Sequence, residues 1–212
     1  MPRCCSAGEY RRFFNRKQAR RDARRYRRGG LDAVSARVRD AAGDVGGQTV
    51  LEVGGGVGAL VLELVRAGAA RATTVELSPA YDEEAQALAR EAGAADRVER
   101  RVGDFVAEAA TVEPADVVIL NRVVCCYPDY DALLGAAAGC ARRRLVFSFP
   151  REAWWTRAGA RVVNGWLRLR RCGFRTFVHP SAALVAAAER GRLRVAAVEP
   201  GRLWQVAVLD RA

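Results

Sequence analysis

The residues best able to do chemistry surround a glycine-rich loop. Gly54, Gly55, Gly56 and Gly58 follow the short β-rich run at residues 50–53 and precede a helical pattern. Glycines directly after a strand let the backbone turn sharply and approach a ligand closely, and the next helix would direct its amide dipoles toward that ligand. The loop also satisfies G-x-G-x-x-G/A, so by itself it is equally compatible with a nicotinamide dinucleotide.

Three acidic residues narrow the choice of ligand. Glu52 stands two residues before the first loop glycine, where a carboxylate can face a cationic group but would repel a diphosphate. Glu76, followed by Leu77, ends the next expected strand about 20 residues further on, where an acid can accept both ribose hydroxyls. Asp104 follows a third expected strand and can accept from an adenine amino group, with Phe105 beside the ring.

The elements that must position these residues alternate along the chain. We expect strands at 49–53, 72–77, 97–102, 115–121 and 144–149, with helices at 59–67, from Pro79 onward, at 130–141, at 152–171 and at 181–190. Alternating strands and helices predict a parallel sheet covered on both faces. The last two strands, 193–199 and 202–210, are joined by Pro200–Gly201, and so short a turn joins only antiparallel strands. The predicted fold class is therefore α/β, a doubly wound sheet with an antiparallel hairpin at its end.

The N-terminal part of the chain differs from the rest. Residues 1–46 are expected to form a basic helical appendage, and residues 47–212 the ligand-binding domain. A helix is predicted at 9–28, where Ala19, Ala23 and Tyr26 make a narrow apolar stripe. Residues 3–28 carry eleven of the basic residues and two acidic ones, so most of the net charge of +11 lies there. A phosphate-binding role for this helix stays open.

Three features of residues 48–210 together resemble the motifs of class I S-adenosylmethionine-dependent methyltransferases. These features are E-x-G-x-G-x-G, the acid at the end of the second strand and Gly-Asp-Phe after the third strand. The resemblance implies a Rossmann-like, seven-stranded sheet whose last hairpin inserts an antiparallel strand. It implies S-adenosyl-L-methionine as the cofactor. It further implies that Glu52 and the loop 54–58 hold the methionine part, Glu76 the ribose and Asp104 the adenine.

A second, closer resemblance concerns the segment after the fourth strand. Val-Val-Cys-Cys-Tyr-Pro at 123–128 is similar to the corresponding stretch of magnesium-protoporphyrin O-methyltransferases, and the basic helix ending near Tyr26 looks like the N-terminal cap of those enzymes. Cys126 stands where that family has a histidine. Asn121 is expected to contact cofactor or acceptor, and Tyr127 and Tyr26 to line the acceptor pocket.

Methyl transfer is an in-line displacement in which the cofactor supplies the reactivity, so the protein must position the reactants and exclude water. A general base is needed only if the acceptor loses a proton. His179 is the only histidine, and it precedes Pro180, so it is either a base or a turn residue. Trp154 and Trp155 could form an apolar wall for a flat substrate or anchor the following helix.

The composition restricts the cellular location, the state of the cysteines and the classes of function that remain. No apolar run approaches the roughly 20 residues of a membrane-spanning helix, and the polar N-terminus lacks a secretory pattern, so we expect a cytoplasmic protein. Its six cysteines are then thiols, and none has the C-x-x-C spacing of a zinc site; no metal is expected. Methyl transfer to a small molecule, at an oxygen, leads the hypotheses. The alternatives are a nucleic-acid methyltransferase and an NAD-dependent oxidoreductase.

Overall fold

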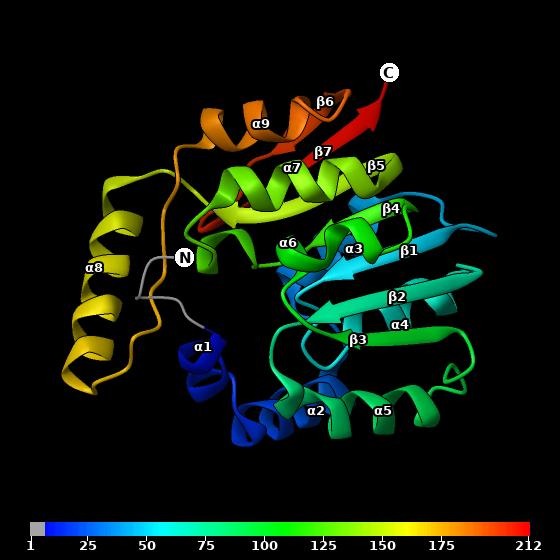
Figure 1. The fold of residues 1–212 in the computed structure, drawn as a ribbon, viewed down its shortest axis with the longest axis horizontal. Coiled ribbons are helices and arrows are strands. Elements are labelled where there is room, and N and C mark those ends of the chain that lie inside the picture. The colour runs from blue at the N-terminus through cyan, green and yellow to red at the C-terminus, as the bar shows by residue number, and fades with distance from the viewer. Residues whose placement is uncertain (1–6) are drawn as a thin grey trace.

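A seven-stranded sheet forms the centre of the computed structural model, which describes residues 7–212. The strand order is β3-β2-β1-β4-β5-β7-β6 (Figure 1). The strands are β1 (Thr49–Val53), β2 (Arg71–Glu76), β3 (Val98–Val102), β4 (Ala115–Leu120), β5 (Ala141–Pro150), β6 (Leu193–Glu199) and β7 (Trp204–Arg211). Strands β1 to β5 pair in parallel, whereas β7 runs antiparallel to both β5 and β6. The predicted fold class is confirmed.

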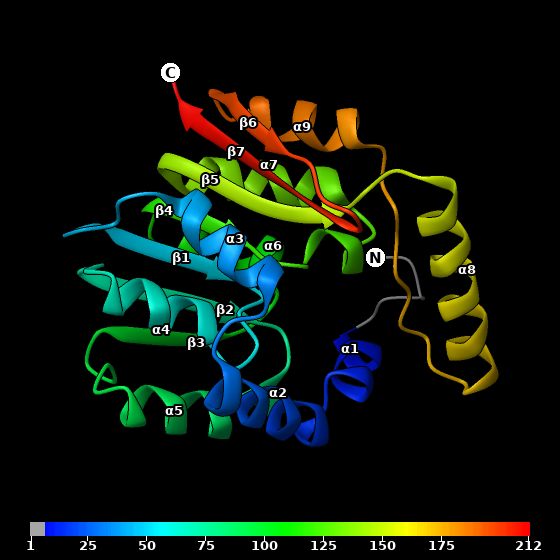
Figure 2. The same ribbon diagram turned by 180° about the vertical axis from the view of Figure 1, so that it is seen from behind.

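Helices cover both faces of the sheet (Figures 1 and 2). The helices are α1 (Ala7–Phe13), α2 (Arg16–Gly29), α3 (Ala33–Ala42), α4 (Ala59–Arg66), α5 (Asp82–Glu91), α6 (Phe105–Glu108), α7 (Tyr130–Cys140), α8 (Trp154–Leu169) and α9 (Ser181–Glu189), with 3-10 turns at Pro79–Tyr81, Ala109–Thr111 and Val124–Cys126. Strand β1 shows why helices pack on both faces of the sheet, because its alternate side chains are apolar on both. Leu51 and Val53 pack with α7 and α9 on one face, and Val50 packs with α3 and α4 on the other. Glu52 lies on the second of these faces, among apolar neighbours.

The single helix predicted at 9–28 is instead two helices, α1 and α2, and that prediction was wrong. The break falls at Asn15, whose backbone is extended and whose side chain accepts hydrogen bonds from the amides of Lys17 and Gln18. Asparagine is strongly preferred at the position before a helix, where its side chain accepts from amides of the first turn, and it therefore marks the start of α2. The break turns α1 toward the carboxyl ends of the strands, while α2 lies beside α5 with Ala19 and Ala23 buried (Figure 1).

Cys125, Cys126, Cys140 and Cys172 are free thiols, and Cys140 and Cys172 are buried as expected. Cys4 and Cys5 lie outside the described residues. Within residues 7–212 no group of histidine, cysteine and acidic side chains is arranged to hold a metal ion. In the same part of the chain, no helix combines the length and the apolar character needed to cross a bilayer.

Candidate active site

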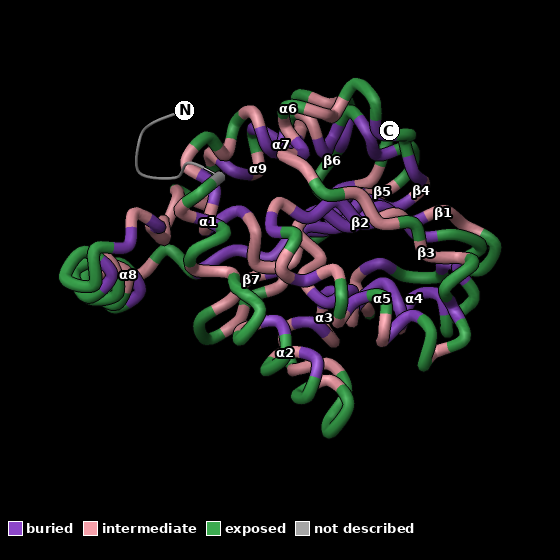
Figure 3. Tube along the Cα trace, turned by 60° about the horizontal axis from the view of Figure 1, so that its bottom comes forward, coloured by how far each residue is buried: buried purple, intermediate pink, exposed green. Residues whose placement is uncertain are grey.

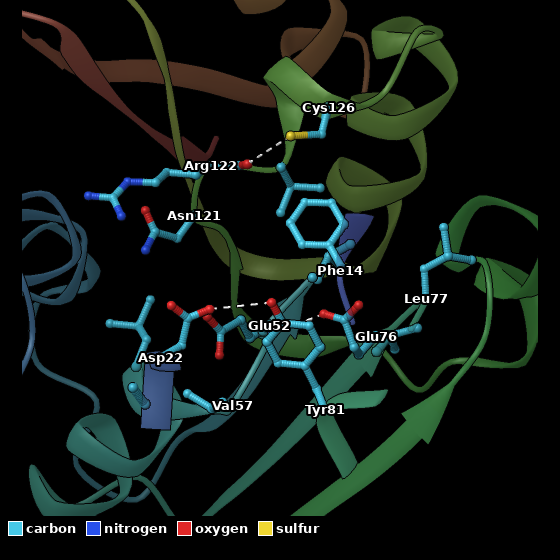
Figure 4. Close-up of a pocket in the computed structure, with 18 of the residues that line it drawn as sticks. Phe14, Asp22, Glu52, Val57, Glu76, Leu77, Tyr81, Asn121, Arg122 and Cys126 are labelled. Atoms are coloured by element: carbon cyan, nitrogen blue, oxygen red, sulfur yellow. Dashed lines mark hydrogen bonds between the residues drawn. The ribbon is translucent and has the colours of Figure 1, made fainter. Parts of the chain in front are cut away.

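A cavity of about 380 Å³ opens at the carboxyl ends of the parallel strands, the edge at which doubly wound sheets bind ligands. Its floor comes from the ends of β1, β2 and β4 and the segment after β3, and its roof from α1, α2 and the start of α3. Figure 4 shows the acids and aromatic rings that face one another across it. The described lining includes all but one of the predicted cofactor residues, the exception being Gly58.

The glycine loop can form because three of its residues, Gly54, Gly56 and Gly58, take backbone conformations that side chains disfavour. Gly54 has φ +68°, and a Cβ there would lie 2.6 Å from a methyl group of Val123. Gly56 has φ +55°, and its amide donates to Glu76 Oε2 at 2.9 Å. Residues 54–56 therefore present bare backbone to the cavity, and Val57 is the loop residue that adds a side chain to the lining. Gly58 instead begins α4.

Glu52 is the most unusual charged group of the cavity. It is only 3% exposed, and its Oε2 has no hydrogen-bond partner among the described residues. A Cβ at Gly55 would lie 2.8 Å from this oxygen, so the loop glycine is what lets the carboxylate reach the loop. Burial, together with the negative charge of Glu76, raises the pKa of Glu52 to about 8. A buried carboxylate without a partner is costly, and a cationic ligand would relieve that cost.

Glu76 has its two oxygens fixed by backbone amides. Oε2 accepts from Gly56 and Oε1 accepts from Ser78, each at 2.9 Å. A carboxylate has about four acceptor positions, so each oxygen keeps one for a ligand hydroxyl. Leu77, the next residue, lines the cavity beside it (Figure 4).

Asp104 and Tyr127 close one end of the cavity. Asp104 begins α6 and accepts from the amide of Val106 at 3.1 Å, while the Tyr127 hydroxyl donates to it at 3.3 Å. Burial and then the charge of Asp104 raise the pKa of Tyr127 above its ordinary value. Tyr127 is thus a poor base. Phe105 is buried next to them and lines the same end.

Asn121, at the end of β4, connects the sheet to the N-terminal helices. Its amide nitrogen donates to Ser35 of α3 at 2.9 Å, and its oxygen accepts from Ser148 of β5 at 2.9 Å. Arg122 follows in a left-handed conformation with φ +60° and pairs with Asp32, the residue that begins α3, at 2.5 Å. Both residues line the cavity. The Asn121 amide and the two terminal nitrogens of Arg122 have protein partners, whereas the buried Arg122 Nε has none among the described residues.

The other two acceptor-site candidates differ in position. Tyr26 lines the cavity, but its hydroxyl donates to Glu63 at 2.6 Å; burial and this contact raise its pKa to about 12. His179 is not part of the described lining: its Nε2 lies 3.1 Å from the carbonyl oxygen of Tyr127, and its ring stacks on Phe177. Burial lowers the pKa of His179.

Several cavity residues escaped the sequence analysis. Phe14 reaches in from the end of α1, and Asp22 from α2 accepts a hydrogen bond from the Tyr81 hydroxyl at 3.3 Å (Figure 4). Burial and the charge of Asp22 raise the pKa of Tyr81. One pattern could have identified this wall: Gln18, Asp22 and Tyr26 recur every four residues and so share a helix face. All three line the cavity.

The residues present fit a cationic nucleoside. The loop offers bare backbone, Glu52 offers an unpartnered carboxylate oxygen, and Glu76 offers acceptor positions for hydroxyls. A cationic group favours release of the proton that buried Glu52 retains, whereas the diphosphate of a dinucleotide would oppose its release and gain no partner there.

Comparison with known proteins agrees with this chemistry. Residues 50–143 match the family model described as "Methyltransferase domain". No curated protein sequence matches the chain. Among solved structures, magnesium protoporphyrin IX methyltransferase from Synechocystis, with bound S-adenosylhomocysteine, is 23% identical with a TM-score of 0.73, over 95% of this chain and 98% of that one.

Two further structures are similar over less of their own length. Mitomycin 7-O-methyltransferase is 26% identical with a TM-score of 0.64, over 85% of this chain and 54% of that one. Geranyl diphosphate C-methyltransferase from Streptomyces coelicolor is 15% identical with a TM-score of 0.65, over 84% of this chain and 76% of that one. Residues 50–143 are therefore a methyltransferase domain, set in a chain that has the fold of S-adenosylmethionine-dependent methyltransferases.

Proposed function

We propose that the protein transfers the methyl group of S-adenosyl-L-methionine to an oxygen of a small molecule bound beneath the N-terminal helices. When bound, the cofactor supplies a methyl group activated by a sulfonium centre. In this proposal Glu52 and the glycine loop hold the methionine part, Glu76 the ribose, and Asp104 with Phe105 the adenine. The observation that carries the proposal is the unpartnered, buried Glu52 oxygen beside the bare backbone of Gly54, Gly55 and Gly56.

The roof of the cavity supports a small and largely apolar acceptor. Tyr10, Phe14 and Tyr81 bring aromatic rings to it, and Cys126 and Tyr127 continue it from the segment after β4. Aromatic walls bind flat ligands well and exclude water from the reaction. We further propose that residues 1–46 serve as this roof, that residues 47–212 are the cofactor domain, and that the protein acts in the cytoplasm.

The polar groups of the roof favour an oxygen that is already anionic. The hydroxyls of Tyr26 and Tyr127 donate to Glu63 and Asp104, so neither is available as a base. Asp22 is the carboxylate on the acceptor side, and it is engaged by Tyr81 and Gln18. A carboxylate acceptor needs no base, and Arg25, which lines the cavity from α2, can pair with one.

Methylation of nucleic acid is less well supported. The outward side of α2 carries exposed Arg21, Arg24 and Arg28, but Arg27 pairs with Glu91 of α5 at 2.7 Å. The inward side of the same helix lines the cavity. The helix thus already has a role that does not require phosphate.

The test supplies methyl-labelled S-adenosylmethionine with a porphyrin carboxylate, a phenol and a mixed RNA. Because the similar Synechocystis enzyme is a magnesium protoporphyrin IX methyltransferase, a porphyrin is the first acceptor to try. We expect label in a small molecule, released by alkali if it is a methyl ester. Arg21→Ala/Arg24→Ala should leave this turnover unchanged. Label in RNA alone, lost in that double variant, would contradict the proposal.

A further inference from the structure

Helix α8 stands away from the rest of the molecule. It follows β5 and projects beyond the end of the sheet in both ribbon views (Figures 1 and 2), and most of its surface is exposed (Figure 3). Trp154 is 76% exposed, Val162 72% and Leu169 84%. Neither expectation for Trp154 and Trp155 is met: they do not line the cavity, and they do not anchor the helix. So many large apolar side chains on one surface element need an explanation.

The residues of α8 divide into three sides. At 100° per residue, Trp155, Val162, Trp166 and Leu169 fall within an arc of about 60°, and all are exposed. Arg157, Arg161 and Arg168 occupy a second, exposed arc. The third side carries the buried Thr156 and Leu167.

The third side fastens α8 to the protein. Leu167 packs with Tyr10, Cys172 and Phe174. Asn164 exchanges two hydrogen bonds with the backbone of Thr176, at 2.8 and 2.9 Å. Within residues 7–212 the apolar side is therefore left exposed, while the helix itself is held in place.

Positive charge predominates near α8, although Arg157 pairs with Glu152, which lies just before the helix. Residues 153–188 contain six arginines and no aspartate or glutamate. Arg170 lies over the ring of Trp166 at 4.4 Å, and Arg151 over Trp155 at 5.9 Å. An apolar side that carries tryptophan and is flanked by arginine is the composition of helices that lie in the headgroup region of a membrane. The arginines complement anionic headgroups.

We propose that α8 is an interfacial helix that docks the protein on the surface of a bilayer containing anionic phospholipid. Trp155, Val162, Trp166 and Leu169 enter the headgroup and upper acyl region, while Arg161 and Arg168 pair with lipid phosphate. The arrangement has a consequence for the cavity. Leu167 belongs to the same cluster as Tyr10, and Tyr10 lines the cavity, so docking sets the acceptor side of the cavity near the lipid surface.

The test uses the full-length protein and vesicles of phosphatidylcholine alone or mixed with phosphatidylglycerol. Three of the four tryptophans lie on α8, so tryptophan emission reports directly on this helix. We expect co-flotation and a shift of emission to shorter wavelength with the anionic vesicles, both reversed by high salt. Each arginine near an anionic surface contributes about fivefold to partitioning, so Arg161→Gln/Arg168→Gln should lower binding by roughly 25-fold.

Matched variants separate this surface from others. Val162→Glu/Leu169→Glu should abolish the emission shift without changing the melting temperature, because both side chains are exposed. Leu203→Glu, which removes an exposed leucine next to β7, and Arg21→Gln/Arg24→Gln on α2 should leave binding unchanged. Equal binding to neutral vesicles, or no shift with anionic ones, would overturn the proposal. So would a dimer that Leu169→Glu dissociates, since a second copy would then cover the apolar side.

Discussion

The two walls of the cavity are built in different ways. The floor is made of short local segments at strand ends, where Glu52 and the glycine loop lie within a few residues of one another and Glu76 bonds to the loop directly. The roof is assembled from α1, α2 and the segment after β4, which are far apart in the chain and meet through side chains. The difference suggests that the floor is specialised for one invariable ligand, and that the roof can vary with the acceptor.

The largest expected effect is the loss of cofactor binding when the glycine loop in the floor of the cavity is altered. Gly56→Val places a branched side chain where φ is +55° and where a Cβ already lies 3.6 Å from the ring of Tyr81. Branched residues strongly disfavour this conformation, so cofactor binding should fall by more than about 100-fold. Titration calorimetry with S-adenosylhomocysteine measures it. Gly139→Ala, at a helical position with open space around it, should bind normally.

A smaller loss should follow from Glu76→Ala. The substitution removes the acceptor of both the Gly56 and Ser78 amides as well as the proposed ribose contact. An unmade hydrogen bond to a charged group costs roughly 1–3 kcal/mol, and the same titration measures the difference. Normal affinity in this variant would mean that the ribose lies elsewhere.

The contrast between floor and roof also explains what the sequence could predict. The succession of strands and helices and the final hairpin follow from periodicity and turn residues, and the acids of the floor follow from motifs whose residues are near neighbours in the chain. The insertion of an antiparallel strand was implied only by the resemblance to known methyltransferases. Phe14 could not be placed in this way, because it reaches the cavity only after Asn15 breaks the helix and turns α1. Asp22 shares a helix face with Gln18 and Tyr26, but the pattern does not say what that face contacts. The two interpretations of His179, a base or a turn residue, could not be separated from the sequence for a related reason: its contact with the Tyr127 carbonyl depends on the path of residues 172–179, which no periodic pattern describes.

A change in the roof should act on the acceptor and spare the cofactor. Phe14→Leu keeps apolar volume but removes a ring that packs against Phe13 and Phe174 at the cavity edge. Loss of this shape should raise the acceptor KM by about tenfold, with the affinity for S-adenosylhomocysteine nearly unchanged. An equal loss of affinity for the acceptor and for S-adenosylhomocysteine would show that the roof and the floor do not bind their ligands independently.

The smallest effect concerns stability and its dependence on pH. Because the pKa of Glu52 is raised from 4.5 to about 8, the folded protein retains a proton there that the unfolded chain releases. The free energy of unfolding therefore falls as pH rises from about 4.5 to about 8. Glu52→Gln removes this dependence and should raise the melting temperature at pH 8.5 by about 2–4 °C for each kcal/mol gained.

The same Glu52→Gln variant should bind S-adenosylhomocysteine more weakly, since it loses the carboxylate that faces the ligand. Thermal melts from pH 5 to 9 and calorimetry on one preparation compare the two effects. Glu99→Gln, on the exposed side of β3, is the matched control and should change neither. A variant that is destabilised at high pH would contradict the assigned environment of Glu52.

The central claim is that this cavity selects a cationic nucleoside and rejects a dinucleotide. Calorimetric titration of the purified protein with S-adenosylhomocysteine, and separately with NAD, tests it most directly. The account predicts micromolar binding of S-adenosylhomocysteine and none of NAD. Clear binding of NAD without binding of S-adenosylhomocysteine would contradict it.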